Sequence, residues 1–108
     1  MSIRIDRSRC SGCGACVRVC PGNLLKLETE SSGEKKCAVR DCRDCWGCCS
    51  CLKECRSQAI GFFLGADMGG RGAVMTVERH QSISRWKVVR PDGTMEVIET
   101  DARSANRY

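Results

Sequence analysis

Cysteine is the residue type whose number and spacing point most directly to chemistry in this sequence, since eleven of the 108 residues are cysteines. A first group follows the pattern Cys-x2-Cys-x2-Cys-x3-Cys-Pro and consists of Cys10, Cys13, Cys16 and Cys20. Three thiolates at these intervals, in a loop relaxed by Gly12 and Gly14, can surround three corners of an iron–sulfur cube. In this pattern the fourth cysteine ligates a different cluster. The group therefore predicts ligands for two [4Fe–4S] clusters.

Residues 37–55 hold seven more cysteines, so the register of a second motif has to be found by testing starting points. A motif that starts at Cys42 places Leu52 where its fourth cysteine should be. A motif that starts at Cys45 closes completely, with Cys45, Cys48, Cys51 and Cys55. Exchange of the fourth cysteines then predicts one cluster bound by Cys10, Cys13, Cys16 and Cys55 and another bound by Cys45, Cys48, Cys51 and Cys20.

Other uses of the cysteines fit the sequence less well. Structural zinc typically takes two separated Cys-x2-Cys pairs rather than runs of three with a fourth, and an odd number of cysteines argues against a fully paired disulfide framework. Cys37, Cys42 and Cys49 remain outside the motifs. One interpretation is that they are small buried hydrophobic side chains, and another is a redox-sensing thiol or a third metal site. No ligand role is assigned to them.

Composition limits the other classes of function. Residues 1–7 contain no apolar signal region, and no apolar stretch is long enough to span a membrane, so a cytoplasmic protein without a membrane partner is expected. The formal charge of +5 falls near neutrality once two thiolate-bound clusters add about four negative charges. The basic residues are also scattered, so nucleic-acid binding is not expected. His80, the single histidine, lies in a polar stretch and is expected at the surface.

The two cysteine motifs form an internal repeat, over residues 8–30 and 43–65. Each half is expected to contain a short strand, a cluster loop, a short helix and a return strand, with residues 28–36 as an exposed connection. The predicted fold class is α+β, a ferredoxin-like pseudo-repeat domain for two [4Fe–4S] clusters with a C-terminal β-hairpin tail. Residues 1–65 are expected to form the cluster domain, and residues 66–108 a glycine-rich linker and the hairpin.

The tail is the part of the sequence that the cluster motifs do not include. Apolar residues on both sides of the turn signal Pro91-Asp92-Gly93 predict the hairpin, and an earlier strand is expected at residues 73–77. The apolar positions expected to share one face of the hairpin are Trp86, Val88, Met95 and Val97. A lone hairpin is marginal in water, so this face should pack on the cluster domain or on another protein.

Segments from both halves of the chain carry a more specific signal. They are Cys20-Pro-Gly-Asn-Leu-Leu, Asp44-Cys-Trp-Gly-Cys-Cys-Ser-Cys, Gln58-Ala-Ile and the tail residues 84–93. Together these segments resemble the family of iron–sulfur beta subunits of adenylylsulfate reductase. The resemblance implies that Trp46 matches the family's tryptophan, which lies between the nearer cluster and a flavin and serves as an electron conduit.

The same resemblance implies a partner and a reaction. The partner would be a flavoprotein alpha subunit related to fumarate reductases, and FAD would be bound in that subunit only. Electrons would pass through both clusters to the flavin, where adenylylsulfate is reduced to AMP and sulfite. The chain would then serve sulfur metabolism in an anaerobic cell.

No acid–base or nucleophilic group of residues stands out in the sequence, so no catalytic residue is predicted and catalysis is assigned to the partner. The expected function is that of a non-catalytic electron-transfer subunit of an oxidoreductase. A free-standing soluble ferredoxin, whose tail packs on its own cluster domain, is the alternative. A third class is a regulatory protein whose labile cluster senses oxygen.

Overall fold

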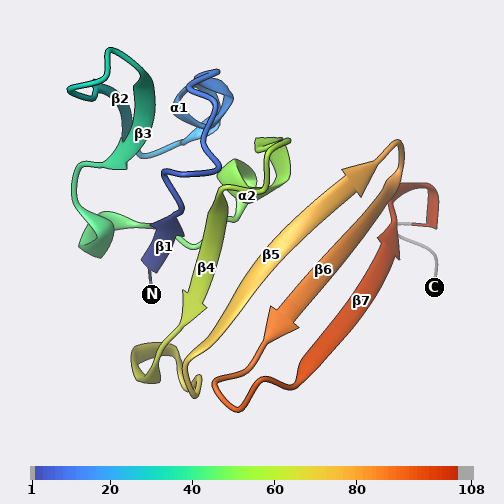
Figure 1. Cartoon of the computed structure of the whole chain (residues 1–108). Coiled ribbons are helices and arrows are strands. Elements are labelled where there is room, and N and C mark those ends of the chain that lie inside the picture. Colours follow the sequence, from blue (N-terminus) through green and yellow to red (C-terminus); the bar gives the residue numbers. More distant parts are fainter. Residues whose placement is uncertain (1, 105–108) are drawn as a thin grey trace.

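The computed structural model describes residues 2–104, and most of its regular secondary structure is β-strand, with two short α-helices (Figure 1). The strands are β1 (Ser2–Ile5), β2 (Leu25–Thr29), β3 (Lys35–Val39), β4 (Ile60–Leu64), β5 (Ala73–His80), β6 (Ile83–Val89) and β7 (Met95–Asp101). The α-helices are α1 (Ala15–Val19) and α2 (Ser50–Glu54), and the 3₁₀-helices are η1 (Cys42–Asp44), η2 (Ala66–Met68) and η3 (Ala102–Ser104).

Residues 2–64 contain one unit twice, in the order strand, loop, helix, strand. The helices α1 and α2 begin at Ala15 and Ser50, and the strands β2 and β4 begin at Leu25 and Ile60, which is a displacement of 35 positions in both cases. The cysteine motifs have the same displacement, from Cys10 to Cys45. The internal repeat predicted from the cysteine spacing is therefore a repeat of backbone structure as well.

The two units interlock through their strands. The antiparallel pairs are β1 with β4 and β2 with β3, so each strand of one unit pairs with a strand of the other. The helices α1 and α2 also contact each other. The exposed connection expected at residues 28–36 is shorter than predicted, because Glu28 pairs with Lys36 and Thr29 with Lys35 at the end of the β2–β3 ladder.

The last three strands extend one sheet beyond the repeat. The strand order is β1-β4-β5-β6-β7. Figure 1 shows β5, β6 and β7 as long strands that lie next to one another. The predicted hairpin is present as β6 and β7, and Gly93 has the left-handed φ of 90° that its turn requires. Because β5 pairs with β4, the hairpin continues the sheet of the repeat. The boundary at residue 65 stays a prediction.

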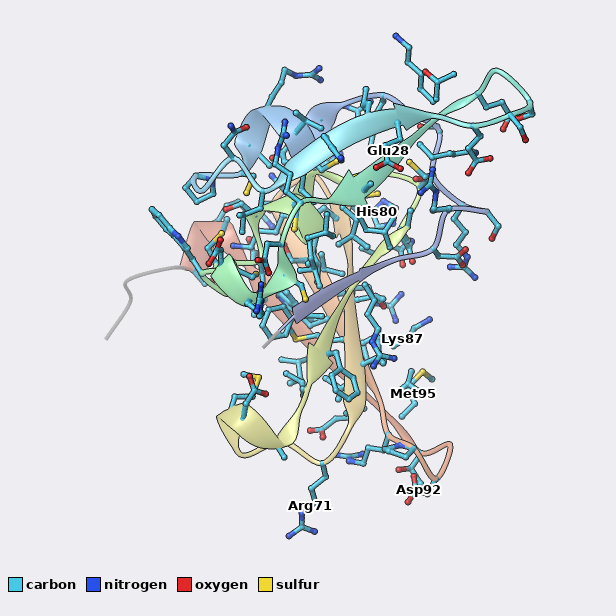
Figure 2. All side chains as sticks on the ribbon, turned by 90° about the vertical axis from the view of Figure 1, so that its left-hand side faces the viewer. Glu28, Arg71, His80, Lys87, Asp92 and Met95 are labelled. Atoms are coloured by element: carbon cyan, nitrogen blue, oxygen red, sulfur yellow. The ribbon has the colours of Figure 1, made fainter. Side chains whose placement is uncertain are left out.

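The prediction that Trp86, Val88, Met95 and Val97 share one face of the hairpin is wrong. Trp86 pairs with Ile98, whereas Val97 pairs with Lys87 and Met95 with Val89. Residues directly opposite in an antiparallel pair point to the same side, so Trp86 lies on one face and Met95 on the other. Figure 2 shows Lys87 and Met95 on the same side of the sheet. Since a shift of one residue moves every side chain to the other face, the composition of the strands alone could not fix this register.

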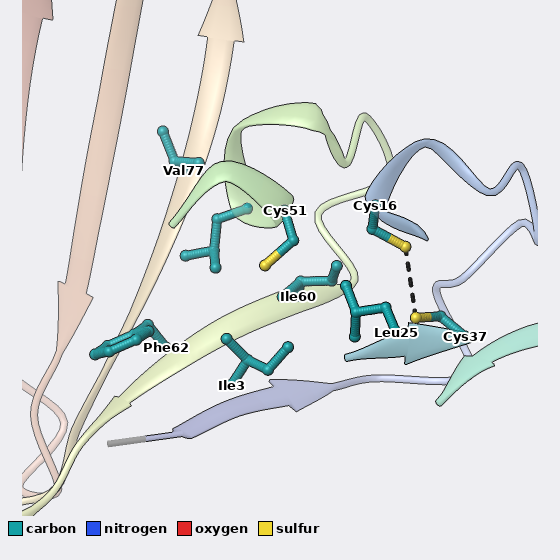
Figure 3. Packing of buried hydrophobic residues seen from close by; sticks show 9 residues of the cluster. Ile3, Cys16, Leu25, Cys37, Cys51, Ile60, Phe62 and Val77 are labelled. Atoms are coloured by element: carbon teal, nitrogen blue, oxygen red, sulfur yellow. Dashed lines mark hydrogen bonds between the residues drawn. The ribbon is translucent and has the colours of Figure 1, made fainter. Parts of the chain in front are cut away.

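The core lies between the helices and one face of the sheet (Figure 3). Its cluster of buried residues consists of Ile3, Cys16, Leu25, Cys37, Cys51, Leu52, Ile60, Phe62 and Val77. Helix α2 is held over the sheet by Leu52, which is 2% exposed, by the Lys53 ammonium 5.7 Å from the ring centre of Trp86, and by an ion pair of 3.3 Å between Glu54 and Arg79. The C-terminal strands thus contribute to the surroundings of the second cysteine motif.

Replacing Leu52 by Ala should destabilise the iron-loaded protein by about 2–5 kcal/mol, because it leaves a cavity between α2 and the sheet. Val97→Ala is the matched control, since Val97 is 41% exposed on β7, and it should change stability by no more than about 0.5 kcal/mol. Anaerobic urea denaturation of the full chain measures both effects. Equal midpoints for the two variants would mean that α2 does not depend on this packing.

Candidate metal centres

Two cavities collect the cysteines of the motifs. One, here called site I, has about 330 Å³ of empty space, and the cysteines in its wall are Cys10, Cys13, Cys16, Cys37 and Cys55. The other, called site II, has about 430 Å³, and the cysteines in its wall are Cys20, Cys45, Cys48, Cys49 and Cys51. The structure thus brings the eight predicted ligands together as two groups of four, in the grouping that exchange of the fourth cysteines requires. Their binding of iron stays a prediction.

The exchange follows from how the two helices end. Cys16 and Cys51 lie inside α1 and α2, whereas Cys20 and Cys55 cap the C-termini with an extended backbone, at ψ values of 115° and 101°. Extended backbone directs the chain away from the helix. The fourth cysteine of each motif therefore lines the cavity of the opposite motif.

The loops that carry the first cysteines repeat in conformation. Gly12 and Gly47 have φ values of 75° and 73°, and the residues before the helices, Gly14 and Cys49, have φ values of 76° and 61°. Cys49 is a non-glycine residue in the left-handed region, a conformation that costs about 1 kcal/mol or more. The loop geometry is therefore kept at the second motif even without the glycine that the first motif has there.

Backbone N–H groups point at cysteine sulfurs in both sites. The amides of Leu24 and Ala59 donate to Cys20 Sγ at 3.4 Å and to Cys55 Sγ at 3.3 Å, two equivalent bonds of the repeat. The amide of Cys37 donates to Cys10 Sγ at 3.3 Å. Such donors stabilise negative charge on sulfur, and hydrogen bonds to the sulfurs help to set the properties of an iron–sulfur cluster.

Burial and hydrogen bonds act on the thiols in opposite directions. Burial raises the pKa of Cys51 to about 12, and it also raises the pKa of Cys49. A hydrogen bond from Ser50 lowers the pKa of Cys48. In the buried pair Cys16 and Cys37, the hydrogen bond between the two thiols lowers the pKa of Cys16 and raises that of Cys37. A thiolate-binding metal would therefore displace protons from the most buried cysteines.

The three cysteines outside the motifs differ in position. Cys37 is 1% exposed in the wall of site I, and Cys49 is partly buried in the wall of site II. Cys42 is exposed in η1 and lines neither cavity. The interpretation of these residues as small buried hydrophobic side chains is confirmed for Cys37 and wrong for Cys42. For Cys49 a signal was present, because it holds the position that matches Gly14 in the repeat.

Two further residues of the sequence analysis have defined places. Trp46 lies in the wall of site II and is 66% exposed, and its indole Nε1 lies 3.4 Å from where a Cβ on Gly22 would be. Part of this side chain thus lines site II, while most of it is exposed to solvent. The prediction of His80 at the surface is confirmed, since its side chain is 69% exposed and contacts Glu78 at 2.6 Å.

The donors at both sites fit iron–sulfur clusters. Each site offers four soft sulfur ligands from the motifs, which suit such clusters. The cavity walls also include apolar side chains, Ile5 and Leu27 in site I and Leu25 and Val39 in site II. In the described part of the chain, no three His, Cys, Asp or Glu side chains form a group that could hold a single metal ion. No helix among the described residues is long and apolar enough to cross a membrane.

Comparison with known proteins agrees with the chemistry of these sites. Residues 3–26 match the family of 4Fe–4S binding domains. An uncharacterized ferredoxin of Methanocaldococcus jannaschii is 35% identical over 56% of this chain and 75% of its own length. A ferredoxin of Pyrobaculum islandicum is 29% identical over 77% of this chain and 80% of its own length. The chain therefore belongs to the ferredoxin family of 4Fe–4S proteins.

Within this family the chain is similar to the beta subunit of adenylylsulfate reductase. That subunit of Megalodesulfovibrio gigas is 30% identical over 93% of the chain, and the chain spans 61% of the subunit's length. A solved structure of adenosine 5'-phosphosulfate reductase in complex with substrate is also similar, with a TM-score of 0.75 and 27% sequence identity. The match covers 92% of the chain described here and 68% of the chain in that structure. The similarity includes the C-terminal strands as well as the cysteine motifs.

The cysteine register can be tested by iron content. The anaerobically purified full chain should contain about eight iron and eight acid-labile sulfide atoms, as expected for two [4Fe–4S] clusters. Cys45→Ser should remove or damage one cluster, because Cys45 lines site II, whereas Cys42→Ser should leave the iron content unchanged. Equal iron loss in both variants would contradict the register.

Proposed function

We propose that this chain is an electron-transfer subunit that holds two [4Fe–4S] clusters and passes electrons, one at a time, to a flavoprotein partner. The observation that carries the proposal is the pair of cavities, each lined by four motif cysteines, in a homologue of an adenylylsulfate reductase subunit. The partner would be an FAD-containing alpha subunit related to fumarate reductases, and the complex would reduce adenylylsulfate to AMP and sulfite.

The cysteines of this chain would hold the clusters and its backbone would stabilise them. Cys10, Cys13, Cys16 and Cys55 are the proposed ligands at site I, and Cys45, Cys48, Cys51 and Cys20 those at site II. A bound [4Fe–4S] cluster supplies one-electron chemistry. The amides of Leu24, Cys37 and Ala59 would stabilise the thiolate ligands through the bonds described above.

Trp46 would mark the end of the chain at which electrons leave. It lines site II, yet two thirds of its surface is exposed, so a partner seated over the indole would lie next to that site. No residue with a catalytic role is proposed here, because the reaction would take place at the partner's flavin.

The outer strands supply a surface on which such a partner could dock. Four of the exposed large apolar side chains lie on the face of the β6–β7 hairpin that bears Lys87: Ile83, Val89, Met95 and Val97. Ile98, 48% exposed, lies on the opposite face, the one that includes Trp86. An exposed apolar surface of this kind marks an interaction site. Site II lies on the Trp86 side of the sheet, because Ile3 lines it and shares that side. We therefore assign the Met95 face to a part of the flavoprotein that extends around the sheet from Trp46.

A free-standing ferredoxin is the second candidate, and two observations favour it. The relative from Pyrobaculum islandicum is a ferredoxin, and the match with this chain covers 80% of its length. The hairpin also continues the sheet of the cluster-binding repeat through the β4–β5 pair, so it needs no partner to be held in place.

Purification of the tagged chain from the cell that produces it, under anaerobic conditions, decides between these functions. The subunit proposal expects a stoichiometric flavoprotein with about one FAD, and reduction of adenylylsulfate by the complex. A ferredoxin would purify alone, with iron and without flavin, and that result would overturn the proposed partner.

Replacing Trp46 by Ala should slow electron transfer from the clusters to the partner's flavin, because the indole shortens the path between them. Iron content should remain at the wild-type level, since Trp46 is exposed and supplies no ligand. Trp46→Phe, which keeps an aromatic ring, is the matched control and should retain more of the rate. Stopped-flow measurement of flavin reduction in the assembled complex tests this. Unchanged rates in the Ala variant would mean that Trp46 is only a packing residue.

Two neighbouring substitutions on β7 test the docking face. Val97→Glu places a charge on the Met95 face and should weaken association with the flavoprotein at least tenfold, since a buried unpaired charge is costly. Ile98→Glu places the same charge on the opposite face and should leave association nearly unchanged. Both variants should keep the wild-type iron content. A stronger effect of Ile98→Glu, measured by titration of the anaerobic subunits, would assign docking to the Trp86 face instead.

A further inference from the structure

We propose that the thiol of Cys37 donates a hydrogen bond to the Cys16 thiolate and thereby raises the reduction potential of the cluster at site I. Cys37 belongs to neither cysteine motif, and sequence analysis could not decide between packing and redox roles for it. The inference rests on the proposed function, because it takes Cys16 as an iron ligand.

The two sulfurs are neighbours in the buried core. Cys37 Sγ lies 3.4 Å from Cys16 Sγ (Figure 3), and the two residues are 1% and 8% exposed. Strand β3 fixes this placement, since Cys37 pairs there with Leu27, another residue in the wall of site I. A second acceptor, the carbonyl oxygen of Ala38, lies farther from Cys37 Sγ, at 3.9 Å.

The direction of the hydrogen bond follows from iron ligation. In the free chain either thiol can donate to the other. A cysteine that holds iron is a thiolate and has no proton, so Cys37 has to be the donor once Cys16 is a ligand. A thiol is a weak donor in general, but a bond to a charged acceptor in a buried site is stronger.

A second contact from the same residue supports this role. The backbone amide of Cys37 donates to Cys10 Sγ at 3.3 Å, so Cys37 directs two donors at two proposed ligands of one cluster. Hydrogen bonds to the ligand sulfurs are among the factors that set cluster potentials. They favour the more negative, reduced state, which raises the potential.

Among the residues that the structure describes, site II has no corresponding thiol contact to a ligand sulfur. Its extra cysteine, Cys49, has its Sγ 3.7 Å from the carbonyl oxygen of Gly47, where it donates to backbone rather than to a ligand sulfur. The effect of Cys37 should therefore be confined to site I. It would make the potentials of two otherwise repeated sites unequal.

Redox titration of the iron-loaded full chain, followed by electron paramagnetic resonance, tests the inference. Cys37→Ala removes the donor, Cys37→Val removes it while it fills the space, and Cys37→Ser keeps a donor. The backbone bond to Cys10 is present in all three. Cys49→Ala is the matched control, because it removes the extra cysteine of the other site. The signal of site I is identified by its altered shape in Cys13→Ser.

The expected result is a downward shift of the site I potential in Cys37→Ala and Cys37→Val, a smaller shift in Cys37→Ser, and none in Cys49→Ala. The site II potential should not move in the Cys37 variants. Unchanged site I potentials at full iron content would overturn the inference and leave the proposed function intact. Loss of half the iron from both Cys37→Ala and Cys37→Val would also overturn it, since Cys37 would then be needed to form the site. A wild-type chain with fewer than two clusters would instead overturn the proposed function.

Discussion

The fourth cysteine of each motif lies in the cavity of the other motif, and the rest of the structure depends on this exchange. It requires each five-residue helix to end just before that cysteine, and Cys20 and Cys55 accordingly have an extended backbone. It also requires the two repeats to remain together, which the β1–β4 and β2–β3 pairs ensure. Each repeat thus supplies the other with a cysteine for its cavity and with a partner for each of its strands.

With clusters bound, the same exchange would compensate for a small core. Three of the nine residues in the buried cluster are cysteines, and the only aromatic side chain in it is that of Phe62, for the part of the chain that the structure describes. A short chain buries too little apolar surface to be stable by that means alone. Four sulfurs on a shared cluster would tie α1, α2 and the loops together, so that the free energy of cluster binding becomes free energy of folding.

The sequence was most informative where spacing determines geometry. The interval of three residues between cysteines, and the failure of the motif at Leu52, were enough to predict which cysteines would face each other. The repeat and the β6–β7 hairpin could also be predicted, because glycines and the Pro91-Asp92-Gly93 turn mark their loops. The faces of the hairpin could not, since a shift of one residue reverses them and no buried pattern in β7 opposes such a shift. The position of Cys37 depends on the pairing of β3 with β2. This pairing could not be predicted, because the polar composition of residues 28–36 indicated an exposed connection.

An exact repeat would give two equivalent clusters, but electron transfer in one direction needs two ends that differ. Differences can come from the C-terminal strands, which contact α2, and from positions at which the two units carry different residues. Ser11 of the first unit corresponds to Trp46 of the second, Gly14 to Cys49, and Pro21 to Arg56. All but Arg56 line the two cavities. The repeat holds the ligands in place, while the exposed indole at site II and the buried Cys37 thiol at site I make the sites unequal. The few side chains that depart from the symmetry of the repeat are therefore the ones through which the two sites would differ in function.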